Sequence, residues 1–144
     1  MITTAGWFYW ALLSAIFAAL TAIFAKIGIQ GVDSDLATLI RVIFISAILT
    51  AFVGFTGKWC NPWELSAKTW FFLGLSGAAT GASWVCYFRA LKIGDASKVA
   101  PVDKLSILMV AVFAVIFLGE RPSIREWLGI AMVASGVVLV AFKR

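Results

Sequence analysis

Five runs of uncharged, largely apolar residues divide this sequence and constrain its fold more than any other feature. The runs cover residues 1–25, 42–57, 69–88, 105–119 and 127–142. Each reaches the length of a bilayer-crossing helix once its flanks are included, because Lys and Arg side chains at a helix end extend to the membrane surface. The chain is 62% hydrophobic with a mean hydropathy of +1.01, more apolar surface than a soluble domain of this length can bury. We therefore predict an all-α integral membrane protein, a bundle of five transmembrane helices.

Turn residues and helix caps separate these runs. They place the spans at about 6–29, 35–55, 67–91, 96–118 and 123–142, within a single transmembrane domain of residues 1–144. The residues from Met1 to Gly6 include no basic side chain, and the first apolar run is too long for a signal peptide. We expect the first span to remain in the mature protein.

Tryptophan placement supports an odd number of spans. Five alternating spans put the N-terminus, the loop after the second span and the loop after the fourth span on one side of the membrane. Six of the seven tryptophans fall on that side: Trp7, Trp10, Trp59, Trp63, Trp70 and Trp127. An aromatic belt at the membrane surface produces such a distribution.

Loop charges do not settle the orientation. Lys58, Lys68, Arg121 and Arg125 flank the spans on the tryptophan-rich side, and Lys26, Lys92, Lys98, Lys143 and Arg144 flank them on the other. The positive-inside rule is decisive only when the bias is large. The pattern therefore predicts either insertion in both orientations or an N-terminus outside with the C-terminus inside.

Several kinds of chemistry are missing from the sequence. The chain has no His, and Cys60 and Cys86 lie on different loops or depths, so no metal site or cofactor is expected. No glycine-rich phosphate loop follows a strand pattern, and the net charge of +5 belongs to membrane flanks rather than to a nucleic-acid surface. We expect neither an enzyme nor a nucleic-acid-binding protein.

Small residues predict helix packing on two spans. Gly74, Gly77 and Gly81 follow one face of the third span, and Gly77 with Gly81 forms a GxxxG motif. Such a face lets another helix approach closely in lipid, and it also lets helices slide during a transport cycle. A weaker small face with Gly129 and Gly136 lies on the fifth span and could join two subunits.

Charges at membrane depth are the main functional candidates. Lys104 lies about 12 Å along the fourth span, where a lone cation costs roughly 2.5 to 3.5 kcal/mol. Asp103 is about 100° away around the helix, so the two side chains cannot enter one narrow seam. We expect Lys104 to face a cavity and Asp103 to face a neighbouring helix, with Arg41 as its partner. The alternative is that all three extend to the surface or form a structural ion pair.

Pro101 and three residues of the third span complete the candidate site. Pro101 removes a backbone hydrogen bond and can break the fourth span beside a cavity, unless it lies in the first turns of the helix. Trp84, Tyr87 and Arg89 lie in the same half of the bilayer, and Trp84 either lines the cavity or faces lipid. The predicted substrate-binding residues are Arg41, Trp84, Tyr87, Arg89, Asp103 and Lys104.

The connection between the last two spans contains Gly119 and Glu120. A carboxylate at a helix C-terminus is disfavoured unless it serves the next helix or pairs with Arg121 or Arg125. We interpret Gly119 and Glu120 as structural residues of this hairpin.

The sequence resembles a known family over nearly its whole length. The motifs are Gly94-Asp95-Ala96-Ser97 with Pro101, Leu118-Gly119-Glu120-Arg121, Trp127-Leu128-Gly129 with Gly136, and Tyr87-Phe88-Arg89-Ala90-Leu91 upstream. They are similar to the EamA domain of the drug/metabolite transporter superfamily. Most members carry two five-helix units in inverted orientation, and this chain is similar to a single unit, as in the half-size bacterial and archaeal branch. The resemblance implies one half of a ten-helix inverted-repeat transporter, completed by another copy.

The resemblance also implies a function. Such proteins are secondary transporters or exporters of small metabolites or drugs, and the first span here lacks the glutamate of the related small multidrug resistance exporters. Arg41, Arg89 and Lys104 favour an anionic or zwitterionic solute. We predict that the protein works by alternating access in an antiparallel homodimer. We expect a multi-pass protein of the inner (plasma) membrane, with the lipid bilayer and a small solute as its other partners. A passive channel or an accessory subunit of another membrane protein remains an alternative.

Overall fold

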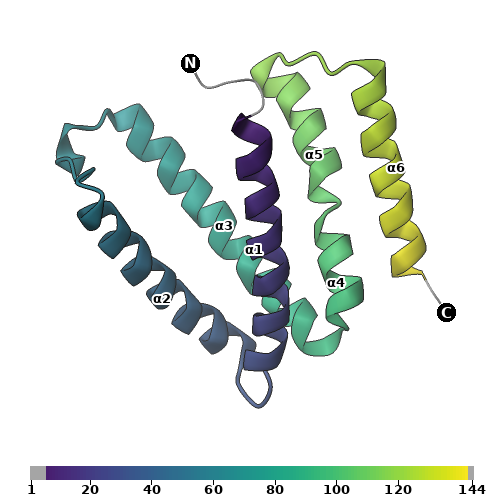
Figure 1. The fold of residues 1–144 in the computed structure, drawn as a ribbon, viewed down its shortest axis with the longest axis horizontal. Helices are drawn as coiled ribbons and strands as arrows, with labels where there is room; N and C mark the ends of the chain where they lie inside the picture. Colours follow the sequence, from purple (N-terminus) through teal and green to yellow (C-terminus); the bar gives the residue numbers. More distant parts are fainter. Residues whose placement is uncertain (1–5, 143–144) are drawn as a thin grey trace. The chain divides into compact units, whose positions relative to one another are not determined.

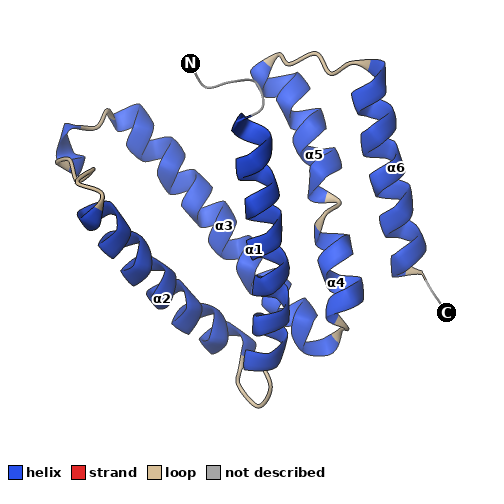
Figure 2. Ribbon diagram, viewed as in Figure 1, coloured by secondary structure: helices blue, strands red, loops and turns tan. Residues whose placement is uncertain are grey.

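The computed structural model describes residues 6–142, and these are helical with short connections and no strand (Figure 2). Five stretches are long and apolar enough to cross a membrane, which confirms the predicted all-α membrane class. The first three are α1 (Gly6–Gly28), α2 (Ser34–Phe55) and α3 (Ala67–Ile93). The fourth consists of α4 (Ala96–Asp103), α5 (Ser106–Phe113) and the π-helical turn η2 (Ala114–Leu118), and the fifth is α6 (Ile124–Ala141).

The chain divides into two compact units, described here one at a time. Residues 24–92 contain the end of α1, α2, the short helix η1 (Pro62–Glu64) and α3. The other unit contains the remainder of α1 with α4, α5, η2 and α6. The assignment of all of residues 1–144 to one domain stays a prediction. Residues 1–5, Lys143 and Arg144 lie outside the described part of the chain.

In the unit of residues 24–92, local capping defines where α2 begins. Asp33 Oδ1 accepts hydrogen bonds from the backbone N–H groups of Asp35 (2.9 Å) and Leu36 (3.1 Å), which otherwise have no partner at a helix start. Gly31 precedes this cap with φ of 76°, a conformation that glycine adopts without strain. α2 and α3 then run in opposite directions (Figure 1).

Two tryptophans of the predicted aromatic belt order the connection between α2 and α3. Trp70 Nε1 donates to the carbonyl of Pro62 at 3.0 Å, and the rings of Trp63 and Trp70 lie 6.3 Å apart. Both side chains are exposed. An indole with a satisfied N–H and an exposed apolar body suits the membrane surface.

In the other unit, α6 packs against α4 and α5, after a turn that reverses the chain (Figure 1). Gly119 has φ of 67° and, with Glu120, donates its backbone N–H to the carbonyl of Ala114, which ends the fourth span. Ser123 and Glu126 then form a capping box at the start of α6. Glu120 therefore contributes its backbone to the hairpin, and the carboxylate that caps the start of α6 is that of Glu126.

Candidate functional site

The site is built around Arg41, which α2 holds about 10 Å from its first residue. The guanidinium carbon of Arg41 lies 4.4 Å from the ring centre of Trp84 and 5.4 Å from that of Phe88. Trp84 and Phe88 are four residues apart on α3, so they share one face of that helix. Such cation–π contacts contribute about 1 kcal/mol each and hold the guanidinium against α3.

Tyr87 adds a polar group to this cluster. Its phenol is close enough to interact electrostatically with Arg41, and its ring lies 6.5 Å from that of Phe88. The structure thus brings together Arg41, Trp84 and Tyr87, three of the predicted site residues. Phe88, which the sequence analysis missed, is buried behind the guanidinium.

Arg41 forms no salt bridge with a carboxylate of its own unit, residues 24–92. Its guanidinium is half-buried and lies over the Trp84 ring, and a guanidinium carries N–H donors along its edge that a ring face does not satisfy. An unpaired cation at membrane depth is costly and is a functional candidate. A carboxylate or phosphate approaching in the guanidinium plane would accept two parallel hydrogen bonds.

Arg89 has a different environment. Its Nε donates to Asp35 Oδ1 at 2.9 Å and one of its terminal amino groups donates to Asp35 Oδ2 at 2.6 Å. This bidentate ion pair joins the start of α2 to the end of α3 and neutralises Arg89. The sequence analysis missed Asp35; the signal was an acid in the first turn of one span and a base near the end of the next, on the same side of the membrane.

Two lysines hold the same end of this unit. Lys26 Nζ donates to the carbonyl of Leu91 at 2.6 Å, and Lys92 Nζ donates to the carbonyl of Val32 at 2.8 Å. Leu91 is fully buried. These contacts tie the ends of α1 and α3 and the loop before α2 together, and so fix the helices that carry Arg41 and Trp84.

Lys104 and Asp103 lie where the fourth span is interrupted. Lys104 Nζ is 3.1 Å from Asp103 Oδ2, so the prediction that the two side chains diverge was wrong. The reason is that α4 ends at Asp103, and the flexible lysine side chain turns back onto its neighbour. The expected pairing of Asp103 with Arg41 stays a prediction.

Pro101 lies inside α4, and the interruption follows it at Lys104 and Leu105. There the backbone N–H groups of Lys104 and Leu105 donate to the carbonyls of Pro101 and Val102, in the tighter pattern of a 3₁₀ turn. Asp95 directly precedes α4, but its side chain makes no capping hydrogen bond, and its Oδ2 lies 3.5 Å from Lys98 Nζ instead.

No group of three or more His, Cys, Asp or Glu residues in the described part of the chain could hold a metal ion. Cys60 and Cys86 are free and exposed.

Five membrane-length helices with charged side chains at depth define a multi-pass membrane protein. Comparison with known families assigns the class: the EamA-like transporter family matches residues 5–142. The chain belongs to this family. Transport is the activity of this class.

Two relatives have descriptions as transporters. A Sinorhizobium protein described as an uncharacterized transporter in the cobO 3' region is 58% identical over 136 residues, which cover 94% of this chain and 96% of that protein. The uncharacterized transporter YxxF of Bacillus subtilis (strain 168) is 27% identical over 136 residues, covering 94% of this chain but only 42% of that protein. No solved structure matches. The chain thus matches less than half of the longer relative and nearly all of the shorter one.

Proposed function

We propose that this protein is a secondary transporter that exports a small anionic or zwitterionic metabolite or drug across the inner membrane. The observation that carries the substrate class is Arg41, a cation at membrane depth with no carboxylate partner within its own unit, residues 24–92. Trp84 and Phe88 orient its guanidinium, and Asp35 neutralises the other nearby arginine, Arg89. The positive charge left for a solute is therefore that of Arg41.

Trp84 and Tyr87 would complete the binding site. The indole provides a flat apolar wall for the solute's carbon skeleton, and the phenol provides a hydrogen bond. Pairing of the guanidinium with a solute carboxylate would offset the cost of holding the cation in the bilayer. A weakly bound solute can leave on the opposite side, as transport requires.

Alternating access requires a second five-helix bundle. We propose that this bundle is a second copy of the chain, inserted in the opposite orientation. The Bacillus subtilis relative is more than twice as long as the matched segment. In the described chain, a Cβ atom built on Gly74, Gly77 or Gly81 meets no atom within 4 Å, so this glycine face is open to another helix. Two copies of the chain, related by inverted topology, would then rock about the solute.

Solute-dependent thermal stabilisation tests the substrate class. The purified protein would be melted with panels of monocarboxylates, dicarboxylates, neutral amino acids and cationic amines. Anionic or zwitterionic compounds should raise the melting temperature of wild type but not of Arg41→Ala, and Arg41→Lys should retain only part of the effect because it lacks the bidentate geometry. Lys58→Ala, which removes a charge from the exposed α2–α3 connection, serves as the control.

Counterflow in proteoliposomes then separates a transporter from a channel. A transporter loaded with unlabelled hit compound accumulates labelled compound transiently and saturates with concentration. Stabilisation by cationic amines alone would contradict the proposed substrate class. Non-saturating flux without counterflow would favour the channel.

Native and introduced cysteines test dual insertion. Cys60 is exposed in the α2–α3 connection, and Gln30 is exposed in the connection before α2, at the opposite end of α2. Variants carrying only Cys60, or only Gln30→Cys, would be treated with a membrane-impermeant maleimide from each side. Dual insertion predicts partial labelling of both variants from either side, and complete labelling of each from one side only would contradict it.

A further inference from the structure

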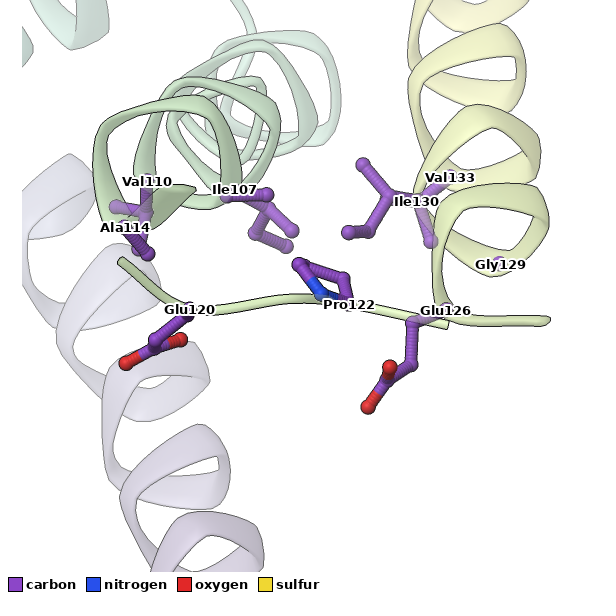
Figure 3. Close-up of a pocket in the computed structure, with 10 residues that line it drawn as sticks. Ile107, Val110, Ala114, Glu120, Pro122, Glu126, Gly129, Ile130 and Val133 are labelled. Carbon is purple, nitrogen blue, oxygen red and sulfur yellow. The ribbon is translucent and has the colours of Figure 1, made fainter. Parts of the chain in front are cut away.

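An apolar groove separates α5 and η2 from α6, within the unit that contains the last two spans (Figure 3). Its volume is about 480 Å³. Ile107 and Val110 line it on one side, and Gly129, Ile130 and Val133 line it on the other. These apolar side chains leave between two membrane helices a hollow that the described chain does not fill.

Two carboxylates stand at one end of the groove. Figure 3 shows the side chains of Glu120 and Glu126 at the rim, with both carboxylates directed away from Ile107 and Ile130. Glu126 accepts a hydrogen bond from the backbone N–H of Ser123 at 2.5 Å. Glu120 forms no salt bridge within residues 6–142, so its charge is available to a ligand.

The groove has a defined polarity along the membrane normal. Glu120 lies in the connection between two spans, and Ile107 lies about two turns deeper than Ala114 along the fourth span, or about 10 Å. On α6, Val133 lies the same distance from Glu126. The groove is thus charged at the membrane surface and apolar toward the bilayer interior, which is the order of headgroup and acyl chain in a phospholipid.

The charges select among phospholipids. The two carboxylates attract an ammonium group, which the headgroup of an anionic lipid such as phosphatidylglycerol lacks. Arg121 and Arg125 lie in the same segment of chain and suit the phosphate that accompanies the ammonium in a zwitterionic headgroup. A primary ammonium also donates hydrogen bonds to carboxylates, which a trimethylammonium cannot.

We propose that the groove is a binding site for phosphatidylethanolamine, with an acyl chain between α5 and α6 and the ammonium at Glu120. The site involves none of the residues around Arg41. It lies in the hairpin of the last two spans, so a bound lipid would brace that hairpin at the membrane surface.

Native mass spectrometry of the full chain tests this proposal, because one spectrum reports bound lipid and oligomeric state. The protein would be titrated with phosphatidylethanolamine, phosphatidylcholine and phosphatidylglycerol of identical acyl chains. We expect phosphatidylethanolamine to bind most tightly. Glu120→Gln should lower its affinity about tenfold, the value of one charge-assisted hydrogen bond, whereas Glu64→Gln in the exposed α2–α3 connection should not.

A second pair of variants tests the groove itself. A Cβ at Gly129 meets no atom within 4 Å, so a side chain can begin there, and Gly129→Leu should occupy the groove and abolish the lipid preference. Ala131→Leu points about 200° away around α6 and should preserve it. Equal binding of the three lipids by wild type, or a dimer that Gly129→Leu dissociates with no change in bound lipid, would overturn the proposal; the second result would assign the groove to another copy.

Discussion

Arg89 donates two hydrogen bonds to Asp35, at 2.9 and 2.6 Å, across 54 residues of sequence. The pair joins the last turns of α3 to the first turn of α2, on the same two helices that carry Trp84 and Arg41. Opposite charges near a bilayer surface remove one another's cost of insertion. The Arg41 site therefore has one unpaired cation rather than two.

Exchange of the two charges tests this relationship. Asp35→Asn and Arg89→Gln should each lower the melting temperature, because each leaves one charge without its partner. The double variant Asp35→Arg, Arg89→Asp should recover most of the loss. Additive losses in the double variant would show that the two side chains act independently.

Gly119 should be intolerant of a side chain. Its φ of 67° is strained for residues with a Cβ, and Gly119→Ala should destabilise the protein by about 1 to 2 kcal/mol in denaturant titrations. Gly54→Ala provides the opposite control, because Gly54 lies in α2 and a Cβ there meets no atom within 4 Å. A neutral Gly119→Ala would mean that the turn does not limit stability.

The glycine face of α3 should determine assembly. Gly77→Leu should lower the dimer fraction measured by single-molecule photobleaching in liposomes, because it separates helices that pack at a GxxxG face. The monomer fold should persist, since a Cβ at Gly77 meets no atom within 4 Å. Ala79→Leu, about 200° away around the helix, is the matched control. An unchanged dimer fraction in Gly77→Leu would place the subunit interface on another face.

The helices were predictable because the signals that define them are local. Uncharged runs fix the spans, and residues such as Ser123 and Gly119 mark their ends through caps and backbone conformation. The structure shifts the predicted boundaries by at most a few residues: α3, for instance, continues to Ile93. Such agreement requires no knowledge of how helices pair.

The contacts of the site were not predictable in the same way. The stack of Arg41 on Trp84 depends on the facing of α2 and α3, which periodicity does not reveal because both helices are apolar on all sides. Asp35 lies two residues from Asp33 and was indistinguishable from a second capping acid. The prediction that the side chains of Asp103 and Lys104 diverge by about 100° assumed a continuous helix. The helix instead ends between these two residues.

The last prediction concerns Lys104, where the fourth span is interrupted. Lys104→Ala should give a folded protein that no longer moves solute in counterflow, because a cation within a membrane span is costly and is by default a functional candidate. Lys104→Arg should retain part of the activity with altered selectivity. Asp103→Asn should instead lower the melting temperature, since it leaves Lys104 without its carboxylate at 3.1 Å. Full transport by Lys104→Ala would show that the lysine only pairs with Asp103 and takes no part in recognising the solute.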